Sequence, residues 1–343
     1  MQRAVLRRLL SLPSPVLRLL AGGGAVHRGG RTLDPRLQMI AALSGRAATI
    51  DLMSPDEARR LNASALRVVS GRLEPGVKVE HRTLPGLRAD LPARLYRPHD
   101  QDPAMPVMVF GHAGGGAIGD LDTCEAFCSL LARIVRCPVL SVDYALAPEH
   151  RFPAGLDDML FAYRWARDNA ASLGAAPGAA MIGGDSIGGS FAAVIAQDLK
   201  RSGEAQPALQ LLIYPCVDLA SETASMTTYA EAFPLSRGAI DWFTGHYLGS
   251  EATPTDPRLS PIRARDLSGL APAVVVTAGF DPLADQGELY ARALRDAGGK
   301  VVYRRYDSLA HGFTAFTGAV PAADEACREI ARLVREALDS AAA

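Results

Sequence analysis

The stretch Gly184-Asp185-Ser186-Ile187-Gly188 follows an apolar run that predicts a strand and precedes small residues that predict the start of a helix. Glycines two residues on either side of Ser186 let the backbone turn sharply without side-chain clashes. A serine hydroxyl becomes an effective nucleophile when such a turn holds it beside a base. The pattern therefore predicts a nucleophile elbow, with Ser186 as the candidate nucleophile.

Two further regions supply the groups that such a nucleophile needs. Upstream, the apolar run from Val107 to Phe110 predicts a buried strand that leads into Gly111-His112-Ala113-Gly114-Gly115-Gly116, a turn with exposed backbone N–H groups. Downstream, Asp281 follows a second strand-like run, and His311 comes last. The chain order Ser, Asp, His is the order expected of an α/β-hydrolase triad, unlike the two common protease orders.

Five motifs spread over about residues 75 to 340 carry a resemblance to a known family. They are His112-Ala113-Gly114-Gly115, Asp143-Tyr144 with Leu146-Ala147-Pro148-Glu149-His150, Gly184-Asp185-Ser186, Asp281-Pro282-Leu283 and His311-Gly312-Phe313. Together they resemble the bacterial hormone-sensitive-lipase-like esterases. That family usually has His-Gly-Gly-Gly followed by an aromatic residue, and this chain departs from the pattern at Ala113 and Gly116.

The resemblance implies an α/β fold, the α/β-hydrolase fold, in which helices flank a mostly parallel central sheet and a helical cap is attached. It implies that the amides of Gly114, Gly115 and Ile187 form an oxyanion hole. It also implies that His112 and Ala113 belong to the oxyanion-loop motif, where His112 braces the loop through a structural hydrogen bond. No cofactor and no metal are implied.

Several carboxylates compete for the role of orienting His311. The resemblance assigns this role to Asp281, directly before Pro-Leu, and leaves Asp285, one helical turn further on, as the rival. Asp185, beside the nucleophile, is expected to brace the loop. Asp143 and Glu149 resemble scaffold residues of the family, for which we expect buried ionic contacts rather than catalysis.

The resemblance further implies a carboxylesterase that hydrolyses short- to medium-chain acyl esters of small molecules through an acyl-enzyme. In this mechanism His311 takes the proton of Ser186 and returns it to the leaving alcohol. An amidase or thioesterase on the same triad is the alternative. A small-molecule receptor of the same fold is disfavoured by His311, and a phosphate-binding protein by the lack of Gly-Lys-Ser/Thr or G-x-G-x-x-G placement.

Hydrophobic patterning predicts the organisation of the chain. Helix starts are expected at Asp34-Pro35 and Ser54-Pro55, an antiparallel hairpin over residues 77–97, and a last amphipathic helix around residues 330–338. Near-continuous apolar strands alternate with helices from Val107 onward, as in a parallel sheet covered on both faces. We divide the chain into an N-terminal arm with cap helices (1–75), a catalytic domain (76–217 and 263–343) and a helical cap insertion (218–262).

The cap insertion contains several large apolar side chains. As a group they favour an apolar lid that, with residues 34–70, roofs the acyl pocket; ordinary core packing is the alternative for any one of them. They are Phe233, Leu235, Ile240, Trp242, Phe243 and Tyr247.

Composition narrows the kinds of binding partner and the cellular compartment that we expect. The 343 residues include 36 Lys and Arg against 37 Asp and Glu, a formal net charge of −1, which disfavours nucleic-acid binding. Five cysteines without paired spacing favour core thiols in a reducing compartment, the cytoplasm. Residues 1–20 place arginines among leucines, and Pro13 and Pro15 interrupt the apolar run, which favours an amphipathic arm over a signal peptide. We expect no stable membrane insertion, at most a peripheral touch by this arm, and a homodimer on the strength of the resemblance.

Overall fold

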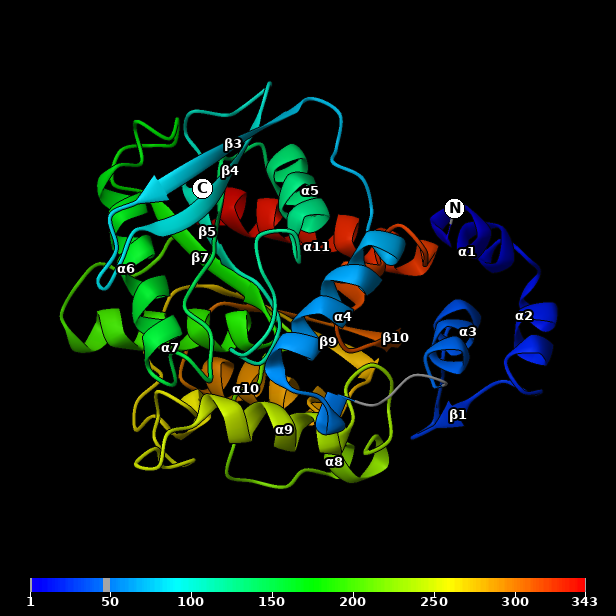
Figure 1. Cartoon of the computed structure of the whole chain (residues 1–343). Coiled ribbons are helices and arrows are strands. Elements are labelled where there is room, and N and C mark those ends of the chain that lie inside the picture. Colours follow the sequence, from blue (N-terminus) through cyan, green and yellow to red (C-terminus); the bar gives the residue numbers. More distant parts are fainter. Residues whose placement is uncertain (1, 46–49, 343) are drawn as a thin grey trace.

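An eight-stranded sheet lies at the centre of the protein (Figure 1). The structure, a computed structural model, describes residues 2–45 and 50–342. The strand order is β10-β9-β8-β7-β5-β6-β4-β3; β5 to β10 pair in parallel, whereas β4 is antiparallel to both β3 and β6. The predicted, mostly parallel sheet is confirmed. The strands are β3 (Val77–Leu84), β4 (Leu91–Pro98), β5 (Val107–Gly111), β6 (Val139–Val142), β7 (Ala180–Asp185), β8 (Gln210–Ile213), β9 (Ala273–Phe280) and β10 (Val301–Ala310).

Both faces of the sheet are buried, which explains why its strands are apolar throughout. In β5, Met108 and Phe110 point into one hydrophobic core, while Val107 and Val109 point into the other. A different set of helices covers each face of the sheet and completes the core there. The first core contains residues of α5 (Glu125–Val135) and α11 (Pro321–Ala342), and the second contains residues of α6 (Ala154–Asp168), α7 (Ile187–Arg201) and α10 (Ala284–Asp296).

The N-terminal segment folds into helices that lie outside the sheet (Figure 1). Both predicted helix starts are confirmed, because the Asp34 side chain accepts from the Arg36 N–H at 2.7 Å and Ser54 forms a capping box with Glu57. Within the described residues, no helix combines the length and the apolar composition needed to cross a bilayer. The elements are α1 (Gln2–Leu10), α2 (Ser14–Leu20), β1 (His27–Arg28), β2 (Arg31–Thr32), α3 (Pro35–Ser44), η1 (Ile50–Leu52) and α4 (Pro55–Val69).

The segment between β8 and β9 contains α8 (Ala224–Thr228), α9 (Arg237–Tyr247) and η2 (Pro261–Arg263), and η3 (Phe313–Phe316) follows β10. The N-terminal segment meets this insertion, because η1 contacts α9. The Trp242 indole N–H donates to the carbonyl oxygen of Met53 at 3.0 Å. Helices far apart in the sequence are therefore joined at the edge of the catalytic body.

Arg59 ties α4 to the body of the protein. Its guanidinium donates to the carbonyl oxygens of Ala117 and Ala147 and forms an ion pair of 2.7 Å with Glu149. The prediction of a buried ionic contact for Glu149 is wrong in one respect, since its side chain is half exposed and Arg59 reaches it from the surface. The prediction is also wrong for Asp143, which forms no ion pair with any described residue; burial raises its pKa to about 6.

Helix α7 approaches the sheet through glycine backbone. A Cβ atom on Gly188 would lie 2.0 Å from the carbonyl oxygen of Gly111, and one on Gly184 would lie 2.3 Å from the carbonyl carbon of Gly188. These distances leave no room for any side chain, because the neighbouring atoms are backbone. The glycines of the elbow are therefore required for α7 to lie directly against β5 and β7.

We predict that Gly188→Ala destabilises the protein by about 3 kcal/mol or more, since overpacking against backbone forces the helix away from the sheet. Urea unfolding of the purified variant measures this. Gly245→Ala is the matched control: this glycine is an exposed residue of α9 with no heavy atom within 4 Å of an added Cβ. The control should gain about 0.5–1 kcal/mol of helix stability, and a Gly188→Ala variant as stable as the parent would contradict the packing argument.

Candidate active site

Ser186 occupies a sharp turn between β7 and α7. Its backbone has φ 56° and ψ −119°, a conformation that residues other than glycine rarely adopt. The turn is held because the Ser186 N–H donates to the carbonyl oxygen of Ile213 on the neighbouring strand at 2.9 Å. The elbow geometry expected from the sequence is therefore present, and it holds the hydroxyl at the carboxyl edge of the sheet.

Asp281 and His311 come together because they follow paired strands. Phe280 at the end of β9 pairs with Ala310 at the end of β10, so the next residue of each strand emerges at the same edge. The Asp281 Oδ2 atom lies 2.8 Å from His311 Nδ1, and His311 Nε2 lies 3.0 Å from Ser186 Oγ. Asp281 is fully buried, and its other oxygen accepts from the Leu283 N–H at 2.8 Å.

The rival carboxylate, Asp285, has a different hydrogen-bond partner. Its Oδ2 atom accepts from the N–H of Ser225 in α8 at 2.8 Å. The structure therefore brings Asp281, and not Asp285, to the imidazole of His311.

The glycine turn after β5 adopts a backbone that only glycine takes easily. Gly114, Gly115 and Gly116 have φ values of +130°, +58° and +72°. Ala113 is absent from the residues with positive φ, so its methyl group is compatible with the loop. A Cβ on Gly116 would lie 2.6 Å from the Tyr247 ring. An aromatic ring of α9 thus fills the space beside the position where the family usually has its own aromatic residue.

Three backbone N–H groups are available beside Ser186. The N–H groups of Gly114, Gly115 and Ile187 donate to no acceptor among the described residues. All three residues line the same cavity as Ser186. Free N–H donors at the start of a helix and in a glycine turn are suited to stabilise a negative oxygen.

His112 lies behind the loop rather than in the cavity. Its ring is fully buried and stacks on Tyr144 at 4.3 Å, and its Nδ1 lies 2.8 Å from the carbonyl oxygen of Ala113. The Tyr144 hydroxyl donates to the carbonyl oxygen of His112 at 2.7 Å. Burial disfavours the imidazolium and lowers the pKa of His112 to about 4. The residue is a neutral brace, in keeping with its expected structural role.

Sequence reasoning missed a buried network next to Ser186. The Asp185 Oδ2 atom accepts from the Tyr214 hydroxyl at 2.9 Å and from the Thr314 hydroxyl at 2.8 Å. Burial raises the pKa of Asp185, and the two hydroxyl donors oppose that rise. The Tyr214 ring lies 4.7 Å from the His311 ring. The sequence held one sign of this network, the position of its two hydroxyl residues in the chain. Tyr214 directly follows a strand, and Thr314 lies three residues after His311.

A cavity of about 820 Å³ opens onto Ser186 and His311. Its walls combine residues from α4 and from the 218–262 segment, together with side chains of α1 and α3. Trp242 is not part of the wall; it faces Met53 instead. Cys216 lines the cavity, whereas the other four cysteines are buried, and all five are free thiols. Cap residues in the wall are Phe233, Leu235, Ile240, Phe243 and Tyr247.

Comparison with known proteins identifies the class. A family model described as alpha/beta hydrolase fold matches residues 108–315. A carboxylic ester hydrolase, LipN, of Mycobacterium tuberculosis is 43% identical over 312 residues, covering 88% of this chain and 82% of its own. An ethyl acetate hydrolase of Pseudomonas putida is 35% identical, covering 84% and 93%.

Solved structures agree with these relatives. An ester hydrolase, EH1AB1, from the metagenome of Lake Arreo superposes with a TM-score of 0.84 at 37% identity, covering 89% of this chain and 98% of its own. The chain is therefore an α/β-hydrolase. It belongs to the hormone-sensitive-lipase-like family of bacterial esterases, and it is a carboxylic ester hydrolase.

We predict that His112 makes stability depend on acid pH. Unfolded His112 takes up a proton near pH 6.5, whereas folded His112 stays neutral down to about pH 4. Between these values the unfolded state binds the extra proton, so the free energy of unfolding falls as pH falls, by on the order of 2–3 kcal/mol near the low end. His112→Phe keeps a ring against Tyr144 but cannot titrate. Denaturant unfolding of both proteins at several pH values should give the variant a shallower acid loss; parallel curves would contradict the prediction.

Proposed function

We propose that the protein hydrolyses short- to medium-chain acyl esters with Ser186 as nucleophile, His311 as base and Asp281 as the group that orients His311. Ser186 Oγ attacks the ester carbonyl while His311 Nε2 takes its proton, and His311 then gives that proton to the departing alcohol. Water attacks the acyl-enzyme, again losing a proton to His311. Transfer of that proton to Ser186 releases the carboxylic acid.

The observation that supports these roles is the unbroken line of hydrogen bonds from Ser186 Oγ through His311 to Asp281. Asp281 selects the tautomer in which Nδ1 carries the proton, so that Nε2 can accept from the serine. The buried carboxylate also stabilises the imidazolium that forms during attack. The free N–H groups of Gly114, Gly115 and Ile187 act as the oxyanion hole, in which donors point to where charge develops.

The cap proposal concerns chain length. The cavity wall is largely apolar side chain, and it is built from the 1–75 and 218–262 segments over the Ser186 edge of the sheet. A volume of about 820 Å³ is ample for a small ester and its acyl chain. One of the relatives is named for the hydrolysis of ethyl acetate, a short-chain ester. The cap excludes water and sets the preferred acyl length.

We predict that Ser186→Ala abolishes turnover of aryl esters, by on the order of a millionfold, and also abolishes covalent labelling by a fluorophosphonate. Both losses follow because each reaction needs the elbow hydroxyl. The variant should keep the thermal unfolding temperature of the parent. A folded Ser186→Ala protein that still accepts the label would assign the nucleophile to another residue.

A second prediction tests the cap. Phe233 lines the cavity and packs edge-on against Phe316 at 6.2 Å, so Phe233→Ala enlarges the apolar space. The kcat/KM ratio of long over short acyl chains should rise roughly tenfold or more, since one methylene in such a pocket is worth about 1–3 kcal/mol. Trp242→Phe is the control, because it removes the hydrogen bond to Met53 and trims a ring that lies outside the cavity wall. Aryl esters graded by acyl length measure the ratio. If the parent, Phe233→Ala and Trp242→Phe share one acyl-length profile, the cap does not set acyl length and Phe233 serves only in packing.

A further inference from the structure

The first two helices present apolar side chains to solvent. On α2, Val16, Leu19 and Leu20 fall at i, i+3 and i+4 and form one face, and Leu19 is 72% exposed. On α1, Val5 is 61% exposed. Figure 1 shows both helices at one end of the molecule, beyond α3. Solvent-facing leucines grouped in this way mark a surface that another phase or molecule covers.

The same segment carries an excess of positive charge. Residues 1–45 contain seven arginines and one acidic residue, Asp34, in a chain whose formal net charge is −1. Arg31 is the one of the seven in an ion pair with a described residue, Asp307, at 3.3 Å. Arg8 and Arg28 are exposed. The arm is therefore a cationic surface on a protein that is otherwise net negative.

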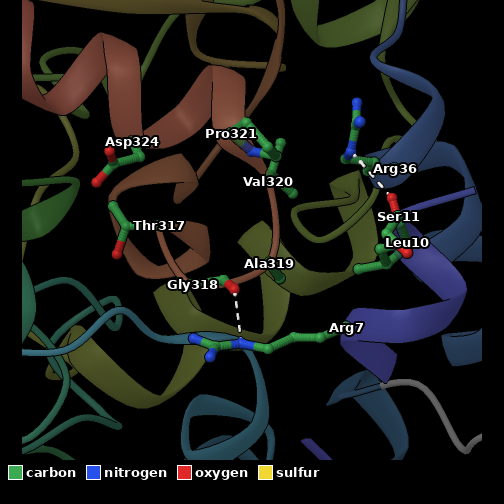
Figure 2. Close-up of a pocket in the computed structure, with 10 residues that line it drawn as sticks. All are labelled: Arg7, Leu10, Ser11, Arg36, Thr317, Gly318, Ala319, Val320, Pro321 and Asp324. Atoms are coloured by element: carbon green, nitrogen blue, oxygen red, sulfur yellow. Dashed lines mark hydrogen bonds between the residues drawn. The ribbon is translucent and has the colours of Figure 1, made fainter. Parts of the chain in front are cut away.

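Backbone contacts hold this surface in place. Arg7 of α1 donates to the carbonyl oxygen of Gly318 at 3.2 Å, and Arg36 of α3 donates to that of Leu10 at 3.1 Å (Figure 2). Carbonyl oxygens satisfy these guanidinium N–H groups without cancelling their charge. Around them lies a hollow of about 470 Å³ that Ser11 also lines, with Asp324 at the start of α11. Leu10 and Leu17 are buried, so the helices are anchored to the core by their other faces.

We propose that the N-terminal arm, residues 2–45, is a docking surface for an anionic lipid membrane. Leu19, Leu20 and Val16 enter the interface while the arginines attract lipid phosphates. Buried apolar area and electrostatic attraction to anionic lipids together set the strength with which such a surface binds a membrane.

Docking there would bring the catalytic cavity close to the lipid. Leu6 of α1 and Ile40 and Leu43 of α3 line the cavity that holds Ser186. An ester dissolved in the membrane would thus meet the cavity through the same segment that touches the lipid. This consequence rests on the proposed function, whereas membrane binding itself does not.

Co-sedimentation with vesicles tests the proposal. The full-length protein should sediment with phosphatidylglycerol vesicles, not with phosphatidylcholine vesicles, and it should be released as salt rises above about 0.1 M, where the Debye length falls below about 10 Å. A double variant, Leu19→Ser with Leu20→Ser, should bind about tenfold less tightly or worse. Arg8→Gln and Arg28→Gln should each weaken binding about fivefold.

Matched variants elsewhere serve as controls. Leu289→Ser and Arg265→Gln change exposed residues of α10 and of the loop after η2, and both should bind vesicles like the parent. The arm variants should keep full turnover of a water-soluble ester. Ser186→Ala should still sediment, which separates this proposal from the catalytic one.

Three outcomes would overturn the proposal. In the first, the parent protein binds both lipids equally or neither. In the second, the control variants lose as much binding as the arm variants. In the third, light scattering shows that the double leucine variant turns a dimer into a monomer while vesicle binding is unchanged, which would make this surface a contact between two copies of the chain.

Discussion

The contact between α7 and β5 is the constraint on which the site depends. A methyl group on Gly188 would lie 2.0 Å from the backbone oxygen of Gly111 in β5, so it would force the helix away from the strand. Because α7 begins directly after Ser186, this contact fixes both the serine and the free N–H of Ile187. A serine held by backbone packing keeps its position beside His311, which is the benefit of placing a strained residue on rigid elements.

The remaining groups of the site depend on strand register. Parallel pairing of β9 with β10 delivers Asp281 and His311 side by side, and β8 delivers Tyr214 to the carboxylate of Asp185. Thr314 adds a second hydroxyl to the same carboxylate oxygen. Residues from four consecutive strand ends are thus connected by buried hydrogen bonds, which are costly to break because no water can replace the lost partner.

The cap and the sheet are interdependent at the glycine turn. Phe243 and Tyr247 of α9 occupy the space that side chains at Gly115 and Gly116 would need, while Arg59 of α4 holds the carbonyl oxygens of Ala117 and Ala147. The cap therefore supports the loop whose N–H groups face the cavity, besides walling the cavity. Changes in α4 or α9 would alter the loop as well as the space available to substrate.

Local sequence determined the elbow, the strands, the helix starts at Asp34 and Ser54, and the order of the triad candidates, because these depend on backbone freedom, capping and hydrophobic period. It left Asp281 and Asp285 as rivals, grouped Trp242 with the cavity residues and expected a buried contact at Glu149. Tertiary structure alone decided these points and the pairing of Asp185 with Tyr214 and Thr314. The physical reason is that a side chain's partner across the fold is set by strand register and helix packing, which no short stretch of sequence encodes.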